Sequence, residues 1–150
     1  MGTVLSLNIS SERGTEKQAV PMVHALEGWG LEGDAHGGDW DRQICVFPIE
    51  AMEKVPPEKR DEVFAGGLTE NITISGIAPE RMLVGTLLQI GEAVIEIFHV
   101  GKDEYKEAGR PYIVSREGRF GKIIQGGIIQ TGDSVDILTD RMAMNNKMRM

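Results

Sequence analysis

Short apolar runs, many of them β-branched, alternate with glycine-rich breaks along most of the chain. In Ser134–Leu138 the apolar Val135 and Ile137 share one face, which is typical of a half-buried strand. In Ala93–Val100 both alternating sets of positions are mostly apolar, which predicts a strand buried on both faces. The pattern as a whole predicts strands at Val4–Ile9, Met22–Leu26, Gln43–Phe47, Asn71–Ser75, Leu87–Ile90, Ala93–Val100, Gly121–Ile124, Ile128–Ile129 and Ser134–Leu138.

Turn and helix signals are fewer. Gly91-Glu92 predicts one hairpin, and Gly126-Gly127 predicts a second between two Ile-rich runs. Two short helices are predicted, one in the IEAMEKV run after Pro48 and one in the EKRDEVFA run after Pro57. Many short strands with about two short helices predict a mostly β fold, either a small β-barrel or a sandwich.

Composition narrows the class of protein. With 150 residues the chain has the length of one domain, which we expect to span residues 1–140. A net charge of −7 argues against a general nucleic-acid binder. The single cysteine excludes an intramolecular disulfide framework. Because the sequence shows neither a membrane-length apolar run nor a signal-peptide pattern, we expect a cytoplasmic protein without a membrane partner.

The last residues, 141–150, hold four of the eight methionines. A flexible C-terminal tail is the first interpretation of this segment. A partner-binding helix is the alternative, because methionine-rich surfaces adapt to varied partners.

The segment 27–43 is dense in glycine and in ligand-type side chains. Its G-x-G-x-x-G spacing does not indicate a nucleotide site, because two further glycines and two aspartates follow where a helix should begin. Asp34 and His36 would face the same side of an extended segment, and with His24 they form a candidate divalent-metal site. A loop in which the carboxylates cap turns is the alternative, since no spacing here is diagnostic of a metal.

A second cluster, between residues 101 and 122, is basic and glycine-rich. Arginines and backbone N–H groups beside glycines can hold a phosphate or carboxylate group, and Lys102, Arg116 and Arg119 are the candidates. The alternative is a solvated strand face whose charge is balanced by neighbouring carboxylates. Cys45 lies inside a predicted strand, where a lone cysteine is typical of a small buried apolar residue.

Several of these segments, taken in order, resemble one family. The segment 20–38 contains G-L-x-G-D-x-H, the segment 67–72 resembles G-x-x-x-E-N-I, and residues 85–91 match G-x-L-L-x-I-G. Residues 99–102 resemble an I-G-K motif, residues 116–120 match R-x-G-x-F, and residues 126–133 match G-G-x-x-x-x-G-D. From about residue 3 to residue 139 the chain resembles the MOSC domain, which occurs in molybdenum-cofactor sulfurases and as stand-alone proteins. The resemblance implies a β-barrel.

The resemblance also implies a pocket for a molybdenum-pterin cofactor or a related anionic ligand, and a partner protein of molybdenum-cofactor metabolism. Pyridoxal phosphate is associated with the family through the sulfurase's aminotransferase-like domain, and nothing in this chain marks a lysine for it. Carried over motif by motif, the ligand-binding residues are Asp34, His36, Arg42, Glu70, Asn71, Lys102, Glu104, Arg116, Arg119 and Phe120.

One position departs from the family pattern. Many members have a cysteine, proposed to carry sulfur, where this chain has Glu104. A carboxylate cannot form a persulfide, so we expect ligand binding without sulfur relay. Whether the chain is an enzyme is left open by the sequence. A sulfurtransferase-like or molybdenum-cofactor-linked activity, a divalent-metal-dependent enzyme and a non-catalytic adaptor module are the alternatives.

Overall fold

A computed structural model describes residues 2–10, 18–35, 37–54, 71–101 and 117–138. Each strand expected from the sequence is present. The described elements are β1 (Gly2–Ile9), β2 (Gln18–Val20), β3 (Met22–Leu26), β4 (Gly30–Leu31), β5 (Ile44–Pro48), η1 (Ile49–Lys54), β6 (Ile72–Ser75), η2 (Pro79–Arg81), β7 (Leu87–Ile90), β8 (Ala93–Val100), β9 (Arg119–Gln125), β10 (Gly127–Gln130) and β11 (Ser134–Leu138).

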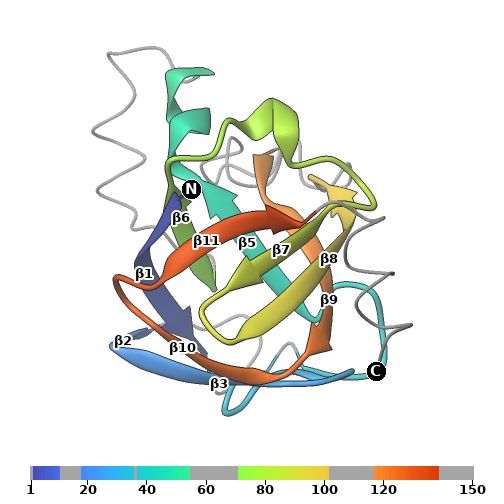
Figure 1. Ribbon diagram of the computed structural model, residues 1–150. Helices are drawn as coiled ribbons and strands as arrows, with labels where there is room; N and C mark the ends of the chain where they lie inside the picture. The colour runs from blue at the N-terminus through green and yellow to red at the C-terminus, as the bar shows by residue number, and fades with distance from the viewer. Residues whose placement is uncertain (1, 11–17, 36, 55–70, 102–116, 139–150) are drawn as a thin grey trace.

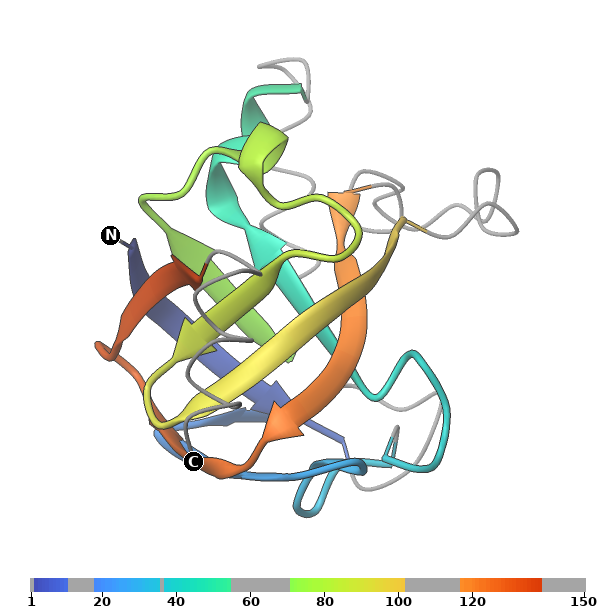
Figure 2. The same cartoon turned by 45° about the vertical axis from the view of Figure 1, so that its right-hand side comes forward.

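The expected β-barrel is confirmed. In the described part of the chain, seven strands follow the order β11-β7-β8-β9-β5-β6-β1, and pairing of β1 with β11 closes the ring (Figures 1 and 2). The closing pairs are Gly2 with Val135 and Thr3 with Ser134. β5 and β6 pair in parallel, while the other described pairs of the ring are antiparallel. The strand β2 extends the sheet outside β1.

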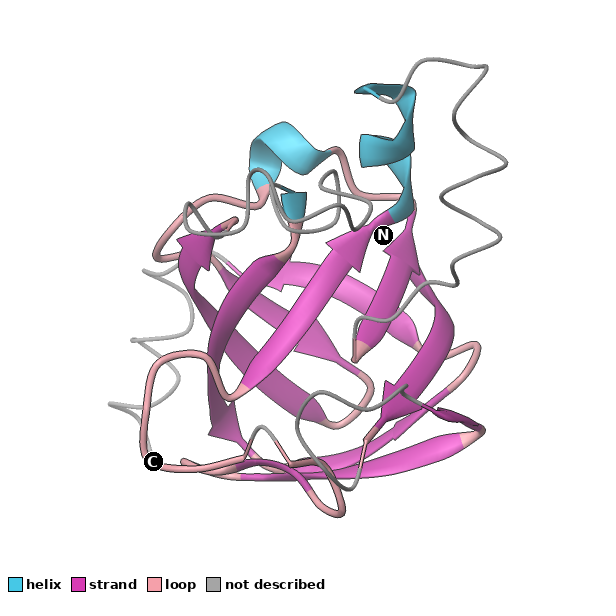
Figure 3. Ribbon diagram, turned by 180° about the vertical axis from the view of Figure 1, so that it is seen from behind, coloured by secondary structure: helices cyan, strands magenta, loops and turns pink. Residues whose placement is uncertain are grey.

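A smaller sheet, ordered β10-β3-β4, lies across one end of the barrel. Seen from behind, η1 and η2 lie at the opposite end (Figure 3). Alternation sends one set of side chains from each barrel strand inward, where β-branched residues such as Ile44, Val46, Ile74 and Ile95 are at most 1% exposed. The core therefore fills the barrel and leaves the outer face of β5, β9 and β8 for other contacts.

The strand β8 corrects one expectation. Ala93, Ile95 and Ile97 are buried, but the alternating Val94 and Phe98 are half-buried. The strand is therefore buried on one face and not on both, because its second face is the outside of the barrel.

The predicted hairpin at Gly126-Gly127 is also wrong. At this point the chain leaves the barrel, and β10 pairs with β3 instead of β9. A Cβ on Gly126 would lie 2.7 Å from the Ala25 carbonyl oxygen, and one on Gly127 would lie 2.5 Å from the Cβ of Glu92. The glycines permit a close approach of the corner to β3 and to the β7–β8 turn. The hairpin predicted at Gly91-Glu92 is confirmed by the β7–β8 pairing.

Helices are short, as expected. The run after Pro48 forms the 3-10 helix η1, whereas the helix predicted at residues 58–65 lies outside the described residues. The sequence did not predict η2, β2 or β4.

The expected tail, residues 141–150, lies outside the described residues. In the described part of the chain, no helix is long and apolar enough to span a membrane.

Candidate functional site

The structure describes half of the residues predicted to bind ligand. Asp34, Arg42, Asn71, Arg119 and Phe120 are described, and they fall into different environments. The remaining predicted residues, which lie outside the described residues, are His36, Glu70, Lys102, Glu104 and Arg116.

Arg42 and Phe120 come together on the outside of the barrel. Phe120 faces outward from β9 but is only 8% exposed, with Cys45 of β5 and His99 of β8 as its cross-strand neighbours. The Arg42 guanidinium carbon lies 4.8 Å from the Phe120 ring centroid, and its Nη1 donates a long 3.5 Å hydrogen bond to the Gly101 carbonyl. A guanidinium over an aromatic face is a favourable cation–π arrangement. It keeps a positive charge in a fixed place on a half-buried side chain.

His99 joins this cluster through an irregularity in β8. Strict alternation would place His99 inside the barrel with Ile95 and Ile97. The register shifts between Ile97 and His99, so that Ile97 pairs with Gly121 and His99 pairs with Phe120. This bulge turns His99 to the outer face, where β-bulges commonly redirect a side chain. Sequence reasoning missed His99 as a site residue because nothing in the run Ile97-Phe98-His99 marks the shift.

Asp41 holds the His99 ring. The His99 Nε2 lies 2.7 Å from the Asp41 Oδ2, and both side chains are partly exposed. This hydrogen bond holds the pKa of the Asp41 carboxyl below its usual range. Together Asp41, Arg42, His99 and Phe120 form what we call the outer-face cluster.

We expect the Asp41–His99 pair to show itself in acid unfolding. A carboxyl whose pKa is lower in the folded state adds stability above its unfolded pKa of about 3.9, and that stability disappears as the pH falls through the folded pKa. The stability difference between the wild type and Asp41→Asn should therefore shrink between about pH 5 and pH 3, from at most about 1 kcal/mol because the pair is exposed. Urea unfolding at several pH values measures it. Asp136→Asn, at an exposed carboxyl of β11, is the control, and parallel acid limbs for wild type and Asp41→Asn would contradict the expectation.

Asn71 and Asp34 are committed to backbone groups. Asn71, 2% exposed, accepts a 3.0 Å hydrogen bond from the Cys45 N–H and donates one of 3.2 Å to the Asn8 carbonyl. Asp34, 7% exposed, accepts a 2.8 Å hydrogen bond from the Ser10 N–H. These contacts tie β1 to β5 and to the loop after β4, so both side chains act in the fold.

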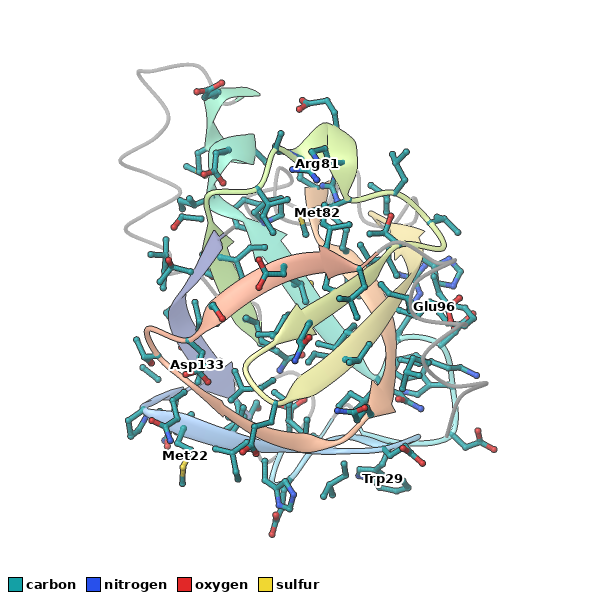
Figure 4. The ribbon with its side chains drawn as sticks, in the orientation of Figure 1. Met22, Trp29, Arg81, Met82, Glu96 and Asp133 are labelled. Carbon is teal, nitrogen blue, oxygen red and sulfur yellow. The ribbon has the colours of Figure 1, made fainter. Side chains whose placement is uncertain are left out.

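Arg119 points into the helical end of the barrel and is 4% exposed. Its Nε donates to the Met82 carbonyl at 3.1 Å, and its Nη2 donates to the Pro79 carbonyl at 2.7 Å. Nη1 donates to the Glu117 carbonyl and lies 3.3 Å from the Glu117 carboxylate. Met82 follows η2 at this end of the molecule (Figure 4). The guanidinium thus satisfies carbonyls of the η2 turn.

A family model described as the MOSC domain matches residues 32–136, most of the chain. This chain belongs to the MOSC domain family. The YflK protein of Bacillus subtilis is 26% identical over an alignment of 112 residues, and the match covers 63% of this chain and 50% of YflK. This MOSC chain therefore spans about half the length of the curated relative that it matches.

Solved structures share the fold. The YuaD protein of Bacillus subtilis superposes with a TM-score of 0.65 at 14% identity, covering 91% of this chain and 96% of YuaD. YiiM from Geobacillus stearothermophilus gives a TM-score of 0.65 at 17% identity, covering 93% of this chain and 76% of YiiM. YiiM from Escherichia coli gives 0.60 at 18% identity, covering 91% and 70%. At such identities these likenesses speak for the MOSC fold.

The described residues of the candidate metal site, His24 and Asp34, do not come together in this MOSC domain. His24 Nδ1 lies 3.2 Å from the Glu32 Oε2 on an exposed surface, and Asp34 is buried against Ser10. Among the described residues, no three histidine, cysteine, aspartate or glutamate side chains are placed to hold a metal ion. His36 lies outside those residues.

A shallow hollow lies at the β7–β8 turn of the MOSC barrel, away from the outer-face cluster. It is lined by Gly91, Glu92, Ile128, Gln130 and Asp133. Its two carboxylates hydrogen-bond to backbone N–H groups of β10. Glu92 accepts a 2.8 Å hydrogen bond from the Ile128 N–H, and Asp133 accepts one from the Gln130 N–H (Figure 4 labels Asp133). These contacts protect the edge of β10, so both carboxylates act in the fold.

Proposed function

We propose that this MOSC-domain protein binds a molybdenum-pterin cofactor, or a related anionic ligand, at the outer-face cluster. One observation carries the proposal. Arg42 is fixed over Phe120 with one nitrogen on the Gly101 carbonyl, while its Nε and Nη2 have no hydrogen-bond partner within the described residues. A positioned guanidinium whose other donors contact no described residue is suited to a phosphate or oxo group.

The surrounding backbone supports this placement. The Gly101 N–H donates a 2.8 Å hydrogen bond to the Gly118 carbonyl. This bond holds the end of β8 against the residue that precedes β9. The sequence places Lys102 directly after Gly101, and Arg116 shortly before Gly118. The Gly101–Gly118 hydrogen bond therefore lies at both ends of the basic segment from which we expect further cations to contact the ligand.

The donor set fits the group. The anionic part of a molybdenum-pterin cofactor offers hydrogen-bond acceptors, and Arg42 offers donors. Redox chemistry at molybdenum would be supplied by the cofactor itself. The chain's own residues would bind and orient the anion. With Glu104 where many members have a cysteine, the proposed role is binding without sulfur relay.

We expect protein purified from a host that makes molybdenum cofactor to contain near-stoichiometric molybdenum and a pterin mass. Native mass spectrometry with elemental analysis measures both. Arg42→Gln should raise the dissociation constant about tenfold or more and so lower the occupancy, because a charge-assisted hydrogen bond contributes about 1.5–3 kcal/mol. Lys122→Gln is the matched control, since Lys122 lies over Phe98 and outside the cluster. Wild-type protein free of both molybdenum and pterin, or equal occupancy in Arg42→Gln, would overturn the proposal.

A further inference from the structure

His99 lies beside the proposed anion site with one ring nitrogen available. Its Nε2 contacts Asp41, and its Nδ1 has no hydrogen-bond partner in the part of the chain that the structure describes. Its cross-strand neighbour Phe120 carries the Arg42 guanidinium over its ring. Two nitrogen-bearing side chains therefore adjoin the same aromatic ring on the outside of the barrel.

The contact with Asp41 assigns a proton to the Nε2 of His99. An ionised carboxylate only accepts hydrogen bonds, so the Nε2 of His99 carries the proton in this pair. In the neutral ring, Nδ1 is then an acceptor. Protonation at Nδ1 changes it into a donor and changes the summed charge of Asp41, Arg42 and His99 from 0 to +1.

The other nearby cations have contacts of their own and do not supply this additional positive charge. Lys122 Nζ lies 5.2 Å from the Phe98 ring centroid, and Arg119 points inward, paired with Glu117. Within the described residues, the charged side chains on the elements packed against His99 are Asp39, Asp41 and Arg42 before β5, Glu96 on β8, and Glu117, Arg119 and Lys122 at β9.

We propose that His99 is a second anion-contacting residue of the Arg42 site, and that it takes up a proton when a doubly charged oxyanion group binds. This inference rests on the proposed function. A dianion beside Arg42 favours the imidazolium form of His99, and the new Nδ1–H then donates to the bound oxygen. The site thereby prefers dianionic groups, such as a phosphate monoester, over singly charged ones.

Sulfate is the probe, because it does not titrate near neutral pH and any proton taken up belongs to the protein. Calorimetric titration of protein made in a host without molybdenum cofactor, at one pH in two buffers of different ionisation enthalpy, measures proton uptake. We expect wild type to bind sulfate with uptake of a clear fraction of a proton. His99→Gln should bind about tenfold more weakly without uptake, and Lys122→Gln should match wild type.

Asp41→Asn provides a test that needs no loss of His99. The charged carboxylate holds the His99 ring through Nε2, so this variant should bind sulfate more weakly than wild type and Lys122→Gln. Unchanged sulfate affinity in Asp41→Asn would contradict the role of His99, as would wild-type sulfate binding without proton uptake.

The outcomes separate the two proposals. Cofactor-carrying protein that binds no sulfate even after cofactor removal overturns the role of His99 and leaves the proposed function standing. Sulfate binding that disappears when the cofactor is present assigns the site to the cofactor's own oxyanion group and supports both. Sulfate binding that persists in loaded protein overturns the link to the cofactor.

Discussion

Replacing Gly121 with alanine is expected to lower the free energy of unfolding by about 3 kcal/mol or more, out of the roughly 5–15 kcal/mol typical of a domain. Gly121 lies inside β9, between Ile44 of β5 and Ile97 of β8. A Cβ at Gly121 would lie 2.0 Å from the Glu96 carbonyl oxygen. Because that oxygen belongs to the backbone of a paired strand, it cannot move away without disrupting the β8–β9 ladder.

Urea denaturation measures the effect as a lower midpoint. Gly85→Ala is the matched control, because Gly85 has a φ of +94° but a Cβ there would have no atom within 4 Å. That variant should lose only about 1–2 kcal/mol from its backbone conformation. If Gly121→Ala were no less stable than Gly85→Ala, the close approach of β8 to β9 would not be the reason for glycine at position 121.

Replacing Arg119 with methionine is expected to lower the free energy of unfolding by about 3–5 kcal/mol, the usual cost of removing one partner of a buried ion pair. The carbonyls of Met82 and Pro79 would lose their guanidinium donors, and the Glu117 carboxylate, whose side chain is 12% exposed, would lose its cation. Methionine retains much of the side-chain volume, so the loss would come mainly from the unsatisfied polar groups.

Two further variants separate the causes. Arg119→Lys keeps the charge but not the planar donor set, and should be intermediate in stability. Arg119→Met combined with Glu117→Gln also removes the carboxylate that faces the lost cation, and should recover part of the loss. Folded Arg119→Lys should retain sulfate affinity, whereas Arg42→Gln should not. Equal stability of Arg119→Met and wild type would show that the η2 turn does not depend on this guanidinium.

The seven strands of the barrel were predictable from sequence because their signal is local. Runs of β-branched residues bounded by glycine marked them, and the β7–β8 hairpin needed only the turn between them. The path at Gly126-Gly127 depends instead on which distant strand accepts β10, and β3 does so from the far end of the sequence. The close contacts that require glycine there exist only after the barrel has formed.

The outer-face cluster was partly predictable. Arg42 and Phe120 were predicted through motif resemblance. His99 could be assigned to the cluster only from the β8 bulge, and Asp41 only from its contact with His99. Arg119 was assigned to an anion because it lies in a basic segment. Its alternation in phase with the buried Ile123 was a signal that it faces the barrel interior.

The β1–β11 seam joins the first and the last of the described barrel strands, so ring closure must wait for β11 to be synthesised. Once β9 has paired with β5 and β8, the growing sheet keeps two open edges, β1 and β7, which are the neighbours that β11 later joins. Unpaired edges are the places where partly folded chains associate with one another. Such long-range closure is also slow compared with local hairpin formation. The interval between emergence of β7 and emergence of β11 from the ribosome is therefore when this chain is most prone to aggregate.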